Sequence, residues 1–398
     1  METLCRNGHL VIVSMKRVLF VIPDLGIGGT NPSLEALYDS IKDLYHVTVF
    51  AISHHTRYRS FLFDDVLMPQ SAALSFLYTD FERQRGIKRI IAFVIKSINR
   101  LLSLFGTDLK VSICKSQAQR LEARYSFDGV VAYQEGYATE FVSYFKNPHK
   151  VAWVHCNYDK WMPKEKSEES LYRQFTHIVC VSNYTASVFA ARYPVLKSRT
   201  VGIHNFIDSG RILRLGSEIV DDPRFLSSGF TILSAGRIHE VKRFREIPAI
   251  AAQIKKRGLD FRWYIIGDTS DLKEISLFRD NAIKNCVSDY VIWLGGKSNP
   301  YPYFKAADLY VCTSESEACP MVFIEATLLG TPIVTTDFPS AFEFIEDKVN
   351  GCIVPLEIMA DSICEMIENT SCYSVILDNI KETVIDNSRQ LDEVMSIL

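Results

Sequence analysis

Short apolar runs alternate with longer amphipathic stretches along the whole chain. Runs rich in β-branched residues occur in the first half at 17–22, 46–50, 129–133, 151–155 and 177–181. A second series occurs at 230–236, 262–267, 290–295, 308–313 and 332–336. Continuously apolar strands separated by helices are typical of parallel sheets that are covered on both faces. The pattern therefore predicts an α/β fold with two doubly wound, Rossmann-like domains.

Residues 205–229 separate the two series. This stretch is rich in Asp, Ser and Gly, and a new apolar run starts directly after it. The apolar stretch before Met15 is too short for a secretion signal, and Met15 begins a natural first strand. The expected parts are a disordered leader at 1–14, a first domain at 15–208, a second domain at 209–378, and a final helix at 379–398 that returns to the first domain.

Composition narrows the class of protein. The length of 398 residues exceeds what one hydrophobic core usually supports, and the net charge of -3 gives no reason to expect a nucleic acid partner. The 10 cysteines are scattered without a C-x-x-C pair, which favours free thiols in a reducing, cytoplasmic compartment. Neither a metal-ligand spacing nor a D-x-D motif occurs, and no apolar run is long enough to span a membrane.

The first apolar run leads into a glycine-rich turn at residues 26–32, and a helical pattern follows. We expect Asn31 to cap this helix and Pro32 to occupy its first turn. Gly28 and Gly29 would let backbone N–H groups approach a phosphate or a sugar, aided by the helix dipole. The G-x-G-G spacing fits neither the dinucleotide fingerprint nor a P-loop, and an ordinary strand-to-helix turn explains it equally well.

Polar residues follow two of the predicted strands. Arg237 and Lys242 come after the run at 230–236, and His155 ends the run at 151–155. Ligands of open α/β sheets bind at the carboxyl ends of strands, so two facing domains imply a cleft there. Arg would give a departing diphosphate forked hydrogen bonds, and Lys would add a point charge. The alternatives are a solvated basic loop and a structural histidine.

Two glutamates follow the run at 308–313, Glu317 in a predicted loop and Glu325 in a predicted helix. Because that helix is largely apolar, an unpaired Glu325 carboxylate would be unfavourable, and the hydroxyls of a ribose are plausible partners. The backbone N–H groups that open the helix would point toward a diphosphate. These donors are Cys319, Met321 and Val322, because Pro320 has no N–H. Alternatively, Glu317 is a solvated loop residue and Glu325 pairs with a neighbouring helix.

These motifs resemble family four of the retaining glycosyltransferases, the group 1 glycosyltransferases with the GT-B fold, in their bacterial surface-polysaccharide type. Glu317 and Glu325, with seven residues between them, resemble the paired-glutamate signature of that family. Other similar segments, in order, are VGIHNFID, GRIHEVKRF, RWYIIGD, SESEACPMVFIEATLLGTPIV and FEFIEDKVNGCIV. They cover almost the whole C-terminal half. The chain departs from the family at 28–32, where GGTNP replaces G-G-A-E-R, and at Pro320, where glycine is frequent.

The resemblance implies that 15–208 is the acceptor-side domain and 209–378 the nucleotide-sugar donor domain, and it implies a role for each matched position. Arg237 and Lys242 would hold the diphosphate in place of a metal ion, so no cofactor is expected. Glu325 would bind the ribose hydroxyls and Glu317 the hydroxyls of the transferred sugar. The remaining positions are Gly28 and Gly29 near the phosphates, His155 beside the sugar, Lys297 near the nucleobase, and the donors of residues 319, 321 and 322.

We therefore expect a retaining transferase that moves a hexose-type sugar from a UDP-sugar to a glycan or lipid-linked acceptor in surface polysaccharide synthesis. A nucleotide-sugar epimerase and a non-catalytic sugar-binding relative are the alternatives. The basic amphipathic stretch at 82–106 indicates peripheral contact with the inner face of a membrane, although an ordinary domain-packing helix explains it as well.

Overall fold

The computed structural model describes residues 3–6, 9–12, 15–25, 29–53, 63–69, 72–78, 86–106, 108–163, 166–225, 229–268 and 271–398. The chain divides into two compact units. The first unit comprises Met1–Ile207 and Asn387–Leu398, and the second comprises Asp208–Asp386. The returning segment thus starts at Asn387 rather than at 379, because helix α15 (Thr370–Glu382) still belongs to the second unit.

The first unit contains a seven-stranded parallel sheet with the order β5-β4-β3-β6-β7-β8-β9. Its strands are β3 (Arg17–Ile22), β4 (His46–Ala51), β5 (Val66–Leu67), β6 (Gly129–Ala132), β7 (Lys150–Val154), β8 (His177–Cys180) and β9 (Thr200–Gly202). Each apolar run predicted in this half is a strand. The edge strands β5 and β9 were not predicted, because they are too short to form an apolar run.

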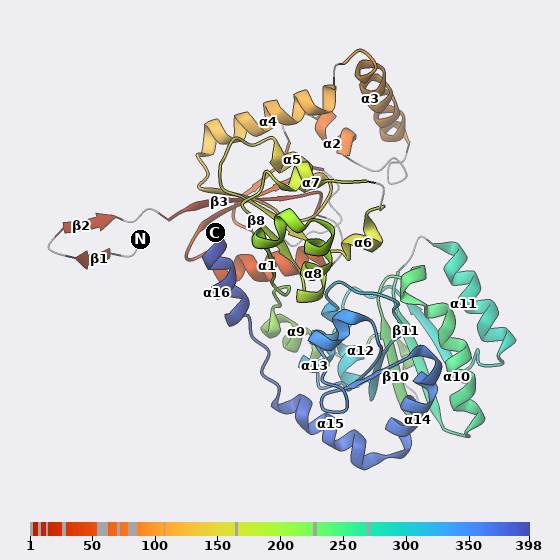
Figure 1. The fold of residues 1–398 in the computed structure, drawn as a ribbon. Coiled ribbons are helices and arrows are strands. Elements are labelled where there is room, and N and C mark those ends of the chain that lie inside the picture. Colours follow the sequence, from red (N-terminus) through yellow and green to blue (C-terminus); the bar gives the residue numbers. More distant parts are fainter. Residues whose placement is uncertain are drawn as a thin grey trace. The chain divides into compact units, whose positions relative to one another are not determined.

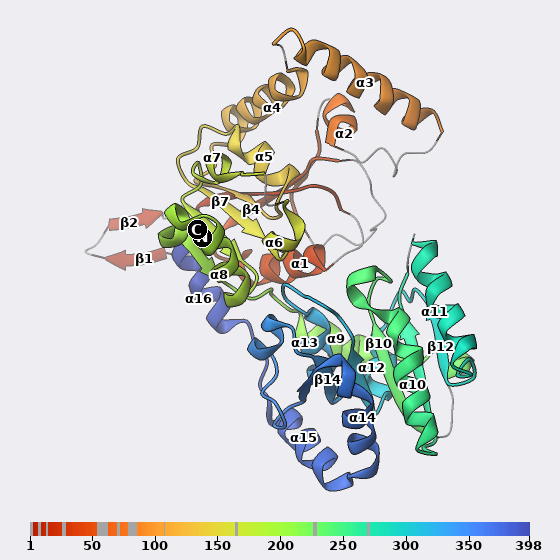
Figure 2. The ribbon, with the colours of Figure 1, turned by 45° about the vertical axis from the view of Figure 1, so that its right-hand side comes forward.

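Helices cover both faces of this sheet. They are α1 (Thr30–Ile41), α2 (Ala72–Tyr78), α3 (Ile87–Ser103), α4 (Leu109–Tyr125), α5 (Tyr137–Ser143), α6 (Tyr158–Trp161), α7 (Glu169–Tyr172), α8 (Asn183–Arg192) and α16 (Ser388–Ile397). Figures 1 and 2 show α4, α5 and α7 on one face, and α1 and α8 on the other. Helix α1 begins earlier than predicted, with Gly29 rather than Asn31 at the N-cap.

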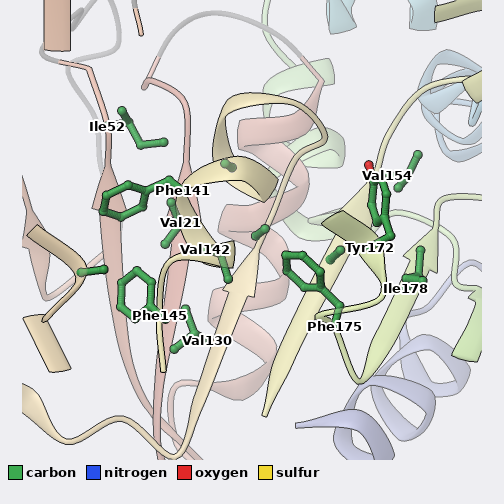
Figure 3. Packing of buried hydrophobic residues seen from close by; sticks show 14 of the residues in the cluster. Val21, Ile52, Val130, Phe141, Val142, Phe145, Val154, Tyr172, Phe175 and Ile178 are labelled. Atoms are coloured by element: carbon green, nitrogen blue, oxygen red, sulfur yellow. The ribbon is translucent and has the colours of Figure 1, made fainter. Parts of the chain in front are cut away.

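The core of the first unit forms where the strands meet α5 and α7. Figure 3 shows Phe141 and Phe145 of this region beside side chains of the central strands. The rings of Phe50 and Phe141 stack with their centroids 5.2 Å apart. This packing fixes the carboxyl ends of β6 and β7, from which candidate site residues project.

Asn387 joins the two pieces of the first unit. Its side-chain amide donates to the carbonyl of Ile207 at 2.8 Å, and its Oδ1 accepts from the N–H of Ile207 at 3.0 Å. Helix α16 follows and packs against α1. The residue at which the chain returns to the first unit therefore bonds to the residue at which it leaves.

Two short strands lie near the start of the chain. Strands β1 (Thr3–Arg6) and β2 (His9–Ile12) pair antiparallel in a separate two-stranded sheet.

The second unit contains a six-stranded parallel sheet with the order β12-β11-β10-β13-β14-β15. Its strands are β10 (Phe230–Ala235), β11 (Phe261–Ile266), β12 (Val291–Gly295), β13 (Leu309–Cys312), β14 (Ile333–Thr336) and β15 (Cys352–Val354). Every run predicted in this half is a strand. The class of two doubly wound α/β units is thus confirmed.

Helices also cover both faces of the second sheet. They are α9 (Ser209–Gly216), α10 (Ile247–Lys256), α11 (Leu272–Lys284), α12 (Tyr301–Ala306), α13 (Met321–Leu328), α14 (Met359–Glu368) and α15. Figure 1 shows α10 and α11 on one face, and α9, α12 and α13 on the other. The indole of Trp263 is fully buried between the layers and donates to Ser234 Oγ at 3.0 Å.

The turns after β10 and β11 touch each other closely. A Cβ atom built on Gly267 would lie 1.9 Å from the carbonyl oxygen of Gly236. Gly236 itself has a φ of 151°, which only glycine adopts without strain. These two glycines therefore let the loop that begins at Gly236 leave the sheet in its observed direction.

We predict that Gly267→Ala lowers the free energy of unfolding by about 2–3 kcal/mol, because the new methyl group forces the two turns apart. Urea denaturation measures this loss. Gly210→Ala in α9 is the matched control, since its nearest neighbour atom is 3.7 Å away, and it should be neutral or slightly stabilising. Equal stability of the two variants would contradict the close approach.

Candidate active site

Arg237 directly follows the turn at Gly236, at the carboxyl end of β10. Its side chain is exposed, and no described residue forms an ion pair or a hydrogen bond with its guanidinium. Its positive charge acts to lower the pKa of Lys242, which places the two cations near each other. Arg237 is therefore an uncompensated positive charge at this end of the sheet.

Lys242 belongs to a short 3₁₀ turn (Glu240–Lys242) in the same loop. Its ammonium group donates to the carboxylate of Glu317, and both side chains are mostly buried. Burial alone would lower the pKa of Lys242, but the Glu317 carboxylate more than offsets that effect and the pKa is raised. The Glu317 carboxylate thus keeps Lys242 positively charged, and we call this ion pair the Lys242–Glu317 pair.

Hydroxyl groups fix the loop that carries Glu317. Ser314 Oγ donates to the Glu317 carboxylate at 2.6 Å, and Ser340 Oγ donates to the Glu317 carbonyl at 2.7 Å. Thr336 Oγ1, at the end of β14, donates to the carbonyl of Ser314 at 2.5 Å. The sequence analysis did not identify these three residues, Ser314, Ser340 and Thr336. The serine-rich loop and the threonines at the end of a strand were the available signals for them.

The two loops are also joined through their backbones. Thr313 Oγ1 donates to the carbonyl of Lys242 at 2.7 Å, and the N–H of Glu315 donates to the carbonyl of Val241 at 2.8 Å. Arg243 lies 3.5 Å from the Glu315 carboxylate. These contacts hold the loop after β10 against the loop after β13, which is the adjacent strand.

Glu325 lies on α13, the helix that follows the loop of Glu317. Tyr301 Oη, on α12, donates to its carboxylate at 3.3 Å. Burial raises the pKa of Glu325 to about 7, and the tyrosine hydrogen bond opposes this shift only in part. Near neutral pH the carboxyl group is therefore ready to ionise fully once further hydroxyl donors reach it.

The N-terminus of α13 offers fewer free donors than the sequence suggested. Pro320 is the N-cap, and the N–H of Met321 already donates to the carbonyl of Cys319 at 2.9 Å. The N–H of Val322 has no partner among the described residues. Val322 is therefore the clearest donor at this helix end.

Lys297 follows β12, at the edge of the same sheet. Its ammonium group pairs with Asp222 at 2.9 Å and lies over the Tyr303 ring at 5.4 Å. Burial acts to lower the pKa of Lys297, but the hydrogen bonds to Asp222 and Tyr303 raise it overall. Arg224 also binds Asp222, so Lys297 is part of a fixed charge cluster.

His155 lies at the carboxyl end of β7 in the first unit. Burial lowers its pKa to about 3, so the ring is neutral throughout the physiological range. One ring nitrogen bonds the backbone of Tyr133, whereas the buried Nε2 has no partner in the described part of the chain. Nδ1 therefore carries the proton, and Nε2 is left as an acceptor.

Glu135 is a partly buried acidic residue beside His155 that sequence reasoning missed. It accepts the backbone N–H of His155 at 2.7 Å, and burial raises its pKa. Its position two residues after the apolar run at 129–133 was the available signal. Glu135 fixes the backbone from which the His155 ring projects.

The structure brings Arg237, Lys242 and Glu317 together, and α13 continues from this group to Glu325. Lys297 lies at the same carboxyl edge of the second sheet, and His155 and Gly29 lie at the carboxyl edge of the first. A Cβ on Gly29 would meet open space within 4 Å. Gly28 lies outside the described residues, and the cleft between the units stays a prediction.

Two further observations hold for the residues that the structure describes. Among these residues, no three His, Cys, Asp or Glu side chains are grouped so as to hold a metal ion. No helix in the described ranges is long and apolar enough to cross a membrane.

Comparison with known proteins gives two results. Solved structures with a similar fold include Anabaena HepE in complex with UDP and glucose, which is 17% identical with a TM-score of 0.67 and covers 96% of this chain and 98% of HepE. The apo lipopolysaccharide outer core galactosyltransferase WaaB is 14% identical with a TM-score of 0.66, covering 96% of this chain and 99% of WaaB. The fold is therefore GT-B, as the sequence predicted.

A family model matches part of the second unit. Residues 229–369 match the family described as glycosyl transferases group 1. The lipopolysaccharide core biosynthesis glycosyltransferase LpsE of Rhizobium meliloti (strain 1021) is 27% identical over 190 residues, which cover 46% of this chain and 52% of LpsE. The match thus spans only about half of that relative.

We predict that Glu325→Gln stabilises the protein at pH 8 by up to about 3 kcal/mol but leaves it unchanged at pH 4. The raised pKa means that ionising Glu325 is unfavourable in the folded state, and this penalty grows as the pH rises from about 4.5 through 7. Chemical denaturation at both pH values measures the difference. Glu357→Gln, which removes an exposed carboxylate, is the control. A gain that is equal at pH 4 and pH 8 would contradict the burial argument.

Proposed function

We propose that the protein is a retaining glycosyltransferase of family four that moves a hexose-type sugar from a UDP-sugar to a glycan or lipid-linked acceptor in surface polysaccharide synthesis. The observation that carries this proposal is the joint placement of Arg237 beside the Lys242–Glu317 pair within the segment that matches the group 1 glycosyltransferase family. HepE binds UDP and glucose, and the names LpsE and WaaB refer to lipopolysaccharide.

The leaving group is a diphosphate that carries concentrated negative charge. Arg237, which has no anionic partner among the described residues, would give it forked hydrogen bonds, and Lys242 would add a second cation without a metal ion. As Lys242 turns toward the phosphate, the Glu317 carboxylate keeps its bond from Ser314 and gains capacity to accept a sugar hydroxyl. Charge stabilisation and sugar orientation are thus linked through one ion pair.

In the proposed reaction the bond between the anomeric carbon and the diphosphate oxygen breaks, and the acceptor oxygen bonds to the same face of an oxocarbenium-like sugar. The acceptor proton passes to the departing diphosphate. Accordingly, no carboxylate acts as a nucleophile. The neutral His155 would accept a sugar hydroxyl through Nε2 and does not serve as a proton donor, because its pKa of about 3 keeps it uncharged.

Glu325 would anchor the ribose, since two hydroxyl donors would complete the partial hydrogen bonding that Tyr301 provides. Lys297 would lie near the nucleobase. The remaining donor contacts that we propose are backbone groups near the phosphates, at Gly28, Gly29, Cys319, Met321 and Val322.

The proposed location is the cytoplasm, with peripheral contact to the inner face of the membrane. A nucleotide-sugar epimerase on the same fold is not favoured, because the similar proteins are named glycosyltransferases. A non-catalytic relative would not need to keep Arg237, Lys242 and both glutamates together.

We predict that Arg237→Ala lowers turnover at least roughly 100-fold while the free energy of unfolding stays within about 0.5 kcal/mol, because the side chain is exposed. Lys242→Met should lower both the turnover and the free energy of unfolding, since Glu317 then loses its counter-charge. Steady-state kinetics and urea denaturation separate the two effects. Arg214→Ala, another exposed arginine of the second unit, is the matched control. Near-normal turnover of the Arg237 variant would refute the site.

Donor binding provides the direct test of the function. At a UDP concentration of about 100 times Kd, the protein should gain about 2.7 kcal/mol, which raises Tm by roughly 5 °C or more, and chelating metals with EDTA should not abolish the shift. Thermal shift with UDP, GDP and ADP measures this preference. If none of the three nucleotides moves Tm, or if only metal-loaded UDP does, the proposal falls.

A further inference from the structure

Helix α3 exposes an unusual amount of apolar side chain to solvent. The exposed large apolar residues on and directly after it are Ile87, Ile90, Ile91, Phe93, Val94, Ile98, Leu101, Leu104 and Phe105. Ile87 is 74% exposed and Phe105 is 79% exposed. Figure 2 shows α3 beside α4 and α2. A contiguous patch of this kind on a folded unit marks an interaction site.

The spacing places most of these residues on one face. Ile87, Ile90, Val94, Ile98 and Leu101 recur at intervals of three and four, so they form a continuous apolar stripe along the helix (α3 stripe). The length of the helix, 17 residues, gives this stripe more than four turns.

A different face of α3 holds the helix on the first unit. Ala92 is fully buried, and Ile95 packs against the core cluster. Asn99 Oδ1 accepts the N–H of Lys110 at the start of α4, at 2.8 Å. Since these residues fix the helix, the α3 stripe is not needed for packing within its own unit.

The charge of this segment is uniformly positive. Lys88, Arg89, Lys96 and Arg100 lie on α3, and no Asp or Glu occurs between residues 87 and 106. The whole chain nevertheless has a net charge of -3, so α3 is a local basic region on an acidic protein. Such a segment complements a surface that combines apolar material with negative charge.

We propose that α3, continued by Leu104 and Phe105, lies in the headgroup region of an anionic lipid bilayer. The α3 stripe enters the boundary between headgroups and acyl chains, and the long Lys and Arg side chains reach the lipid phosphates. A second copy of this chain is a poorer occupant. Two α3 helices would bring eight cations together with no acidic residue of either helix to pair with them.

The inference gives the proposed lipid-linked acceptor a physical reason to meet the enzyme at a membrane surface. That link rests on the proposed function, whereas the lipid contact itself does not. Binding is therefore measured without any sugar donor, and donor hydrolysis is measured without vesicles. If vesicle binding is lost and donor hydrolysis is retained, the lipid contact has failed. If donor hydrolysis is lost and vesicle binding is retained, the proposed transferase function has failed.

The experiment measures flotation of the full chain with two kinds of vesicle, one of phosphatidylcholine alone and one that also contains about 30% phosphatidylglycerol. Each is tested at low and at high salt. We expect binding to the anionic vesicles only, with affinity that falls as salt rises. The charge variant Lys88→Gln/Arg100→Gln should weaken binding about fivefold for each charge removed.

The apolar variant Ile87→Gln/Ile90→Gln/Leu101→Gln should reduce binding at least roughly tenfold. These side chains are exposed, so unfolding in urea should match that of the wild type. The matched control carries Leu272→Gln, Ile283→Gln and Val384→Gln, which are equally exposed apolar residues of the second unit, and it should bind as the wild type does.

Three results would overturn the proposal. The first would be that the wild type does not float with anionic vesicles at low salt. The second would be that the control variant loses as much binding as the apolar variant. The third would be that the wild type forms a dimer in sedimentation, which the apolar variant abolishes, while neither protein binds lipid. The last result would assign the α3 stripe to a second copy of the chain.

Discussion

The Lys242–Glu317 pair is the interaction on which the arrangement of the candidate site depends. It joins the loop after β10 to the loop after β13, and these two strands are neighbours in the sheet. Hydroxyl bonds from Ser314 and Ser340 keep Glu317 in place from its other side. The cation and the carboxylate neutralise each other, so the net positive charge of the region resides on Arg237. In the proposed site, an arriving polyanion would meet Arg237, which has no anionic partner among the described residues, and Lys242, which can exchange its carboxylate partner for a phosphate.

This arrangement separates the groups that stabilise the fold from those that await a ligand. Lys242 and Glu317 are satisfied by each other, and Lys297 is satisfied by Asp222. By contrast, Glu325 has only a long hydrogen bond from Tyr301, and the buried Nε2 of His155 has no partner among the described residues. Both groups accept hydrogen bonds, and hydroxyl-rich molecules are the natural donors. These two acceptors are thus complementary to the hydroxyl groups of the proposed sugar-nucleotide donor.

The sequence was informative where burial leaves a strong pattern. Central parallel strands such as β3 and β13 are apolar throughout, because helices cover both of their faces, and every such run was found. The strands β9 and β15 were missed because short edge strands need few apolar residues. For the site, the need of Glu325 for a partner could be predicted from its apolar helix, but Tyr301 could not be named. The contacts of Ser314, Ser340 and Glu135 depend on three-dimensional loop geometry that residue spacing does not specify.

The second unit is an insertion within the first, and the double hydrogen bond between Asn387 and Ile207 joins the two ends of the first unit where the insertion begins and ends. During synthesis, Asn387 and α16 emerge only after the whole second unit has been made. Until then, the backbone groups of Ile207 lack their amide partner and the surface of α1 lacks the helix that covers it. The first unit therefore cannot complete its packing until the second unit has been synthesised, which couples the maturation of one unit to the synthesis of the other.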